Sequence, residues 1–194
     1  MRRGRVFQPV LAIKTNKYRF FIIGLYSEGR NEEEHSKELE YLSLYDTVTG
    51  LPNRSLFHDR LSRNISQAIL AEENIGLLLV DLDRFKEVNE ALGHERGDLL
   101  LKKIARRFER NMKSDETLAR LGGDEFILSG ETFSDKEECK RNALQVSEHL
   151  LSILKVIYII EQHHLYISAS IGVSLMKSSE HNSVNFIKEA DIAM

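Results

Sequence analysis

Cysteine is almost absent from this sequence of 194 residues, and sequence repeats and low-complexity tracts are absent altogether. Because Cys139 is the only cysteine, no disulfide can form within the chain, and a reducing compartment fits this composition. The 42% of hydrophobic residues is enough for a real core. We therefore expect one globular domain with an appendage, held together by packing rather than by cross-links.

Long apolar runs and a strong charge imbalance are missing as well. The most apolar stretch, YRFFIIGLY at 18–26, is too short to cross a bilayer. The basic start, Met1 to Arg3, is not followed by the apolar segment of a signal peptide. A net charge of −3 gives no sign of a nucleic-acid-binding surface. We expect a cytoplasmic domain that binds no nucleic acid, although other segments could tether a longer parent chain to a membrane.

The sequence pattern divides the chain into three parts. Residues 1–28 contain two short apolar runs around a polar KTNK, which predicts a hairpin that is either the tail of another domain or packed on the main body. Residues 29–45 predict a polar linker helix, capped by Asn31, with a thin apolar stripe that includes Leu39 and Leu42. Residues 46–194 form the main domain.

The main domain alternates between helical and strand patterns. Helices are expected over 55–71, 84–92, 99–112, 134–156 and 183–194. Strands are expected over 75–83, 116–121, 125–130 and 165–176. This order predicts an α+β fold in which helices cover one largely antiparallel sheet. Asp83 and Asp98 could each cap the helix that follows them, and His163-His164 is expected in a polar turn.

Two pairs of acidic residues stand at the ends of predicted strands. Asp81 and Asp83 end the buried strand IGLLLVDLD, and Asp124 and Glu125 follow a glycine turn. If the two strands are neighbours, Asp81 and Asp124 can face each other across a small gap. Hard divalent cations such as Mg²⁺ prefer oxygen ligands of this kind together with substrate phosphates.

The glycine turn adds a second feature of a phosphate site. Gly122 and Gly123 have no Cβ atoms, so their backbone N–H groups can closely approach an anion. Lys86 could add a positive charge for the phosphates. Together these features predict a metal-assisted phosphate site. Each has an ordinary alternative, because Gly-Gly-Asp hairpins are common without catalysis and a single lysine is usually a solvated surface residue.

Five motifs follow one another between residues 41 and 194: DTVTGLPNR, DLDRFKEVNEALGHERGD, RLGGDEF, SASIGVSL and EADIAM. In this combination they resemble the GGDEF domain of diguanylate cyclases. The resemblance implies a nucleotidyl-cyclase-like fold, with a central, mostly antiparallel sheet wrapped by helices. It also implies that two GTP molecules are condensed into cyclic di-GMP with release of pyrophosphate. The cofactor would be Mg²⁺ or Mn²⁺, and catalysis would need a homodimer because each site holds one GTP.

The resemblance implies roles for individual residues. Asp81, the main-chain carbonyl of Leu82 and Asp124 would bind the metal, and Asp124 would also accept the proton of the attacking 3′-hydroxyl. Glu125 and Lys86 would complete the catalytic set, with Lys86 stabilising charge on the phosphates.

The substrate pocket is implied in the same way. Asn89 and Asp98 would read the guanine edge by hydrogen bonds, and the glycines of the turn would admit the triphosphate. The full set of substrate-binding residues would be Phe85, Asn89, His94, Asp98, Gly122 and Gly123.

Three features depart from the family pattern. Asn89-Glu90 stands where Asn-Asp is usual. Lys113 and Glu116 stand where many members have the arginine and aspartate of an inhibitory product site. Lysine cannot reproduce the planar fork of arginine, so weak or absent product inhibition is expected. The family also continues beyond EADIAM with further phosphate contacts, so we expect this chain to be a piece of a longer protein.

The ends of the chain resemble parts of larger architectures. The N-terminal runs resemble the last hairpin of a PAS-type sensor, and EADIAM resembles members that are followed by an EAL phosphodiesterase domain. Three functions fit these resemblances: an active cyclase controlled by an upstream sensor, a catalytically weak GTP-binding module that regulates an attached EAL domain, and a pure dimerisation or signalling module. The complete GGDEF stretch favours the active cyclase, because degenerate members lose its acids or glycines.

Overall fold

The computed structural model describes residues 32–113, 116–176 and 183–193. The predicted hairpin in residues 1–28 and the predicted cap at Asn31 lie outside these ranges. Within them, no helix combines the length and the apolar character that a membrane span requires.

The chain separates into two compact units, Met1–Glu38 and Leu39–Met194. Helix α1 (Glu32–Leu44) contains the described residues of the first unit. The second unit contains a four-stranded antiparallel sheet in the order β2-β3-β1-β6. Its strands are β1 (Asn74–Leu82), β2 (Thr117–Gly122), β3 (Glu125–Phe133) and β6 (Ala169–Met176).

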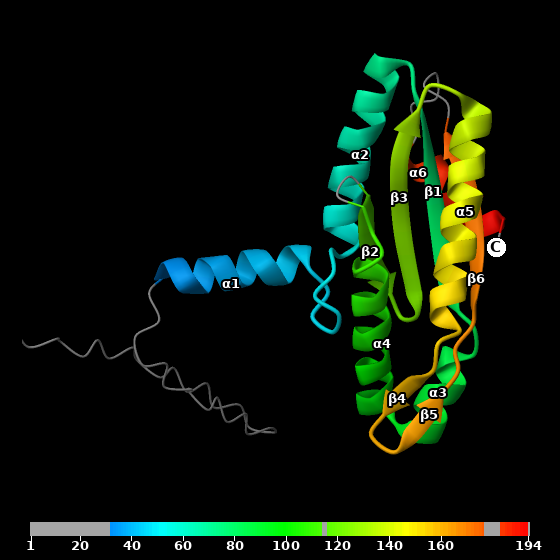
Figure 1. The fold of residues 1–194 in the computed structure, drawn as a ribbon. Coiled ribbons are helices and arrows are strands. Elements are labelled where there is room, and N and C mark those ends of the chain that lie inside the picture. Colours follow the sequence, from blue (N-terminus) through cyan, green and yellow to red (C-terminus); the bar gives the residue numbers. More distant parts are fainter. Residues whose placement is uncertain (1–31, 114–115, 177–182, 194) are drawn as a thin grey trace, which may run out of the picture. The chain divides into compact units, whose positions relative to one another are not determined.

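Helices cover both faces of this sheet (Figure 1). They are α2 (Arg54–Ala71), α3 (Phe85–Leu92), α4 (His94–Glu109), α5 (Lys136–Leu154) and α6 (Ser183–Ile192). The predicted α+β architecture, a mostly antiparallel sheet wrapped by helices, is therefore confirmed.

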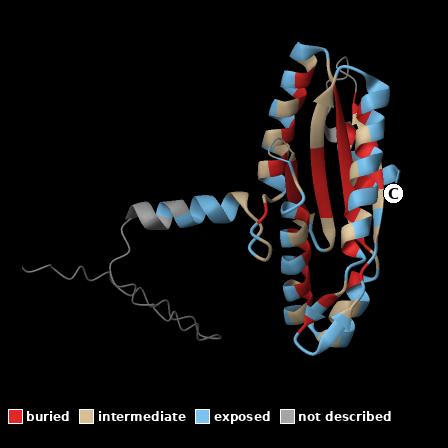
Figure 2. Cartoon of the chain, viewed as in Figure 1, coloured by how far each residue is buried: buried red, intermediate tan, exposed pale blue. Residues whose placement is uncertain are grey.

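Strand β1 lies at the centre of the fold and is buried along nearly all of its length (Figure 2). Leu78 and Val80 face the core formed with helices α4 and α5. Leu77 and Leu79 face the second core, formed with α2 and α6. Because both faces are covered, the strand reads as a continuous apolar run rather than an alternating one. This burial fixes the end of β1, where Asp81 and Leu82 lie.

A two-stranded hairpin was not expected from the sequence. It consists of β4 (Tyr158–Ile160) and β5 (His163–Leu165). The prediction that His163 and His164 form a turn is wrong, because both residues pair with β4 in β5. The strand predicted over 165–176 is correspondingly divided between β5 and β6. Strands of three residues are too short to show an alternating pattern in the sequence.

Candidate functional site

The acidic residues come together where β1 ends and β3 begins. The two strands are antiparallel neighbours, with Asp81 opposite Glu125 in the register. The backbone N–H of Leu82 donates to the carbonyl of Asp124 at 3.3 Å. The predicted adjacency of the strands is therefore confirmed, and Asp81, Asp124 and Glu125 share one end of the sheet. The catalytic roles assigned to these residues stay predictions.

Negative charge is concentrated at this end of the sheet. Burial raises the pKa of Asp81, and the charges of Asp124, Glu125 and Asp83 raise it further. Arg54 provides partial compensation at 3.7 Å from Glu125, in a solvent-exposed pair. Like charges held this close disfavour ionisation, and a bound cation would relieve the repulsion. The cluster therefore has the electrostatic character of a cation site.

The donor atoms are all oxygen, which suits Mg²⁺ or Mn²⁺. Among the residues described, no group of three or more His, Cys, Asp or Glu side chains could hold a metal by itself. Mg²⁺ in proteins is commonly bound by one or two carboxylates, with waters and substrate phosphates completing its shell. The residues present therefore fit an ion that the substrate helps to hold.

The turn between β2 and β3 requires its glycines for backbone reasons. Gly122 has φ 142° and Gly123 has φ 53°, both in the region that side chains disfavour. A Cβ added at either position would meet none of the described atoms within 4 Å. Space is thus open on this turn, as the close approach of a phosphate would need.

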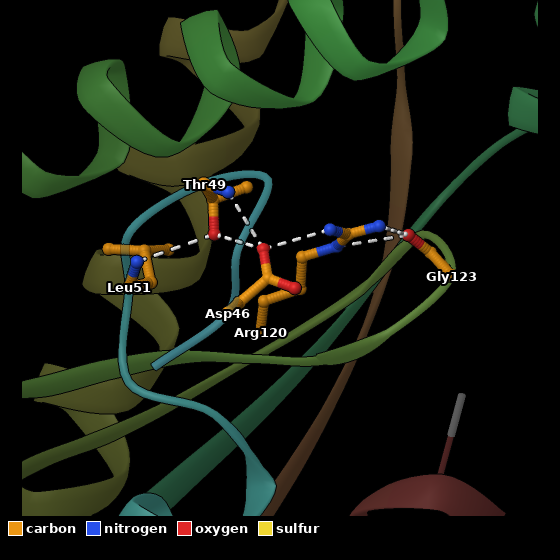
Figure 3. A network of polar contacts seen from close by, with 5 residues as sticks. All are labelled: Asp46, Thr49, Leu51, Arg120 and Gly123. Atoms are coloured by element: carbon orange, nitrogen blue, oxygen red, sulfur yellow. Dashed lines mark hydrogen bonds and ion pairs between the residues drawn. The ribbon is translucent and has the colours of Figure 1, made fainter. Parts of the chain in front are cut away.

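A buried polar network holds the turn in place (Figure 3). Arg120, only 8% exposed, donates to the carbonyl of Gly123 from Nε at 3.1 Å and from Nη2 at 2.6 Å. Its Nη1 donates to Asp46 Oδ1 at 2.9 Å. The same oxygen accepts from the N–H and the hydroxyl of Thr49, at 2.8 and 2.6 Å. The DTVTGLPNR loop is thereby fixed to the glycine turn.

Sequence reasoning did not identify Asp46 and Arg120 as a pair, although both stand in quoted motifs. Burial by itself would raise the pKa of Asp46, but the hydrogen bonds from Thr49 and Arg120, with the charge of Arg120, lower it overall. The signal in the sequence was an arginine among the apolar residues of LARL, because a buried arginine needs an acceptor.

The prediction that Asp83 caps helix α3 is wrong. Its carboxylate accepts hydrogen bonds from the hydroxyls of Ser168, at 2.6 Å, and Ser170, at 2.9 Å. The N-cap position is held by Arg84 with φ 59°, and its side chain makes no capping bond. Asp83 thus ties the end of β1 to the start of β6.

The prediction that Asp98 caps a helix is also wrong. Helix α4 begins earlier, at His94, because Gly93 ends α3 and serves as the N-cap of α4. Asp98 therefore lies inside α4, and Asn89 lies on α3; both side chains are half-buried. Neither side chain forms a hydrogen bond with another group in the described part of the chain. Their hydrogen-bonding capacity is thus available to a ligand.

The other residues predicted to bind substrate lie in different surroundings. His94 is exposed at the start of α4. Phe85 is 5% exposed and packs in the core, so it supports α3 from within. Lys86 has an 88% exposed side chain whose Nζ lies 3.6 Å from Glu90 Oε1. Exposed pairs of this kind contribute little, so Lys86 remains free to bind an anion.

Lys113 and Glu116, which stand in place of the arginine and aspartate of the inhibitory product site, both form interactions within the protein. The backbone N–H of Lys113 donates to Glu116 Oε2 at 2.8 Å. The Nζ of Lys113 lies 2.8 Å from Glu131 Oε2. The lysine and glutamate thus have local partners of their own.

An antiparallel sheet of this topology, with acidic residues and a glycine turn where its central strands meet, is of the nucleotidyl-cyclase-like class. Residues 43–194 match the family model for the diguanylate cyclase GGDEF domain. The chain therefore belongs to the GGDEF family, which confirms the resemblance carried by the five motifs.

Relatives and solved structures agree with this membership. MucR of Pseudomonas aeruginosa, a bifunctional diguanylate cyclase/cyclic di-GMP phosphodiesterase, is 41% identical over 159 residues, covering 82% of this chain and 22% of MucR. The diguanylate cyclase TpbB of the same species is 31% identical over 168 residues, covering 86% of this chain and 38% of TpbB. This chain therefore spans well under half the length of either relative.

The fold itself is similar to solved GGDEF structures. A sensory box/GGDEF family protein from Caulobacter crescentus matches with a TM-score of 0.71 and 32% identity. The match covers 77% of this chain and 94% of that protein's chain.

Proposed function

We propose that this domain is a diguanylate cyclase that condenses two GTP molecules into one cyclic di-GMP and two pyrophosphates. It would act as a metal-dependent homodimer controlled by an upstream sensor. The observation that carries the proposal is the group of carboxylates, Asp81, Asp124 and Glu125, beside an open glycine turn. The carboxylates could bind a metal ion, and the open turn leaves space for a triphosphate bound to that ion.

The acidic residues would divide the work of the reaction. Asp81, Asp124 and the carbonyl of Leu82 would hold Mg²⁺ or Mn²⁺. When bound, such an ion neutralises phosphate charge and lowers the pKa of a hydroxyl. Asp124 would accept the proton of the 3′-hydroxyl of one GTP. The oxygen of that hydroxyl would then form a bond to the α-phosphorus of the other GTP, and pyrophosphate would leave. Glu125 would add negative charge beside Asp124, within reach of Arg54.

Other residues would bind the phosphates and the base. The N–H groups at Gly122 and Gly123 would face the phosphates, and Lys86 would leave its weak pair with Glu90 to join them. An ionised Asp98 can only accept hydrogen bonds. Guanine presents two adjacent N–H donors on its edge, whereas adenine presents one amino group, so the free carboxylate favours GTP.

The product requires two copies of the domain. Each site would hold one GTP, and closing a ring through two phosphodiester bonds needs two sites face to face. Positioning would then supply a large share of the catalysis. A linker helix preceding the domain is where an upstream sensor could set this geometry.

The proposal is tested by incubating the purified protein with GTP and Mg²⁺ and following cyclic di-GMP by chromatography. Wild-type protein should form the product, and Asp124→Asn should lose activity by about 10²-fold or more, as expected for a positioned base. Asp59→Asn is the matched control, because Asp59 is an exposed acid on α2 paired with Arg63. Product formation by Asp124→Asn at more than about a tenth of the wild-type rate would contradict the assignment.

A second candidate function is a catalytically weak GTP-binding module that regulates an attached phosphodiesterase. The observation in its favour is the similarity to MucR, whose name includes both activities. This function predicts that GTP binds without turnover and changes the activity of the attached domain. The same chromatography distinguishes the two, because GTP that is bound but never converted supports the regulatory module.

A further inference from the structure

A glycine inside helix α4 lies directly against the side chain of Asn89. Gly97 is buried in the first turn of α4. A Cβ at this position would lie 1.9 Å from Asn89 Oδ1 and 3.0 Å from Asn89 Cγ. The ring of Phe85 would be 3.3 Å away. The amide of Asn89 therefore occupies the volume that any larger residue at position 97 would need.

The conformation of Gly97 itself does not call for glycine. Its φ is not among the positive values in the described chain, unlike that of Gly93. Its N–H donates to the carbonyl of Gly93 at 3.2 Å, as in an ordinary helix. Glycine inside a helix is destabilising relative to alanine. The requirement for glycine thus comes from its neighbour Asn89 rather than from the helix backbone.

The contact also orients the amide of Asn89. The amide oxygen packs against Gly97, so the –NH₂ group lies farther from that residue. The –NH₂ group makes no hydrogen bond within the described part of the chain, so it is free to donate to a ligand. The acceptor Asp98 directly follows Gly97 in α4. A donor and an acceptor on adjoining helices are the two groups that a guanine edge would pair with.

We propose that Gly97 is a positioning residue for base recognition, which holds the amide of Asn89 in place by leaving room for it beside Asp98. This inference rests on the proposed function and on the prediction that Asn89 and Asp98 read the guanine. Gly97 acts through Asn89 and does not itself touch the nucleotide. It therefore determines specificity for GTP without belonging to the catalytic set.

Gly97→Ala separates base recognition from folding. The atom in its way is the end of a flexible side chain, so rotation of Asn89 relieves the clash, and Phe85 needs to yield by only a few tenths of an ångström. Alanine also favours the helix. The variant should fold with its Asn89 amide displaced.

The experiment compares wild type, Gly97→Ala, Asn89→Ala and the double variant by calorimetric titration with GTP and with ATP, each with Mg²⁺. Gly97→Ala should weaken GTP binding about 3–10-fold, the loss of one hydrogen bond, and leave ATP binding unchanged. In the Asn89→Ala background, Gly97→Ala should cause no further loss. Melting temperatures report on folding, and if Gly97→Ala melts early, the double variant should recover because the clash is gone.

Three results would overturn the inference: unchanged GTP affinity in Gly97→Ala, independent losses that add in the double variant, or a folding defect that the double variant does not relieve. Failure of the wild type to bind GTP would instead overturn the proposed function. In that case the side-chain amide resonances of Asn89 still test the positioning. They shift in Gly97→Ala if the glycine holds the amide, and an unshifted pair contradicts that role.

Discussion

Asp81 carries its charge at a place where three other carboxylates lie close by. Burial is the largest cause of its raised pKa, followed by the charges of Asp124, Glu125 and Asp83. A raised pKa in an acid means that the fold disfavours its ionised form. The repulsion between these carboxylates destabilises the ligand-free domain, and a bound cation would relieve it. The same cluster of charges therefore explains both the raised pKa of Asp81 and the proposed metal binding.

Asp81→Asn should abolish stabilisation by metal and nucleotide. Mg²⁺ with GTP at about 100 times its Kd should stabilise the wild type by about 2.7 kcal/mol. In a protein of this size each kcal/mol raises Tm by roughly 2–4 °C. The ligand-free variant should melt no lower than wild type, because the substitution removes repulsion. Melting curves with and without Mg²⁺-GTP check both points, and an equal ligand-induced shift in Asp81→Asn would exclude it as a metal ligand.

The residues of the site differ in how far the sequence could predict them. Asp81, Asp124 and the glycine turn were predicted because each stands at the end of a strongly patterned strand. The capping role of Asp83 was wrong because its hydroxyl partners, Ser168 and Ser170, lie 85 and 87 residues away. A carboxylate at a strand end can accept hydrogen bonds either from the N-terminus of the following helix or from hydroxyls on a neighbouring strand. Only the pairing of β1 with β6 decides between these two partners.

At the level of elements, the Asp46–Arg120 pair joins a loop to the hairpin that carries the motif acids. Asp46→Asn should destabilise the protein by about 1–3 kcal/mol at neutral pH, because Arg120 would lose its charged partner. The pKa of Asp46 lies below its ordinary value of 3.8, so the ionised form is favoured in the fold. The stability that it contributes is present above that value and is lost as the pH falls through the lower, folded pKa.

Denaturant unfolding of wild type and Asp46→Asn across the acidic range measures this contribution. The difference between them should be constant near neutral pH and shrink at strongly acidic pH. Asp59→Asn is the control, because its pair with Arg63 is exposed and should contribute only a few tenths of a kcal/mol. A difference for Asp46→Asn no larger than that of the control would show that the buried pair does not hold the hairpin.

Some helices and strands can be predicted from their own sequence, whereas others depend on contacts with distant parts of the chain. The long helices and the buried strand β1 were predicted because their periodicity lies within the element. The hairpin of β4 and β5 was missed because tertiary contacts define it. Lys103 donates to the carbonyl of Ile159 at 2.6 Å, and Arg107 donates to that of Val156 at 2.6 Å and lies 3.8 Å over the ring of Tyr158. These contacts reach from α4 to a segment some fifty residues later, which no local window spans.

At the scale of the whole molecule, regulation by product should be weak. Lys113 is paired with Glu131, and Glu116 accepts from the backbone of Lys113. Lys113 does not offer the planar guanidinium fork of arginine, which binds two phosphate oxygens at once. Progress curves with added cyclic di-GMP should therefore show little inhibition at micromolar product. Lys113→Arg combined with Glu116→Asp should increase inhibition, and strong inhibition of the wild type would mean that another surface binds the product.

The proposed cyclase activity depends on the association of two subunits. If each domain presents one GTP, a pair that contains one Asp124→Asn subunit can form only one of the two phosphodiester bonds and releases no cyclic product. Mixing equal amounts of wild type and Asp124→Asn at constant total protein should then leave about one quarter of the cyclase activity, because subunits pair at random in a symmetric dimer. The same mixture with Asp59→Asn in place of Asp124→Asn should keep full activity. A remaining activity of one half would mean that each subunit completes the reaction independently, and the face-to-face arrangement of two sites would be wrong.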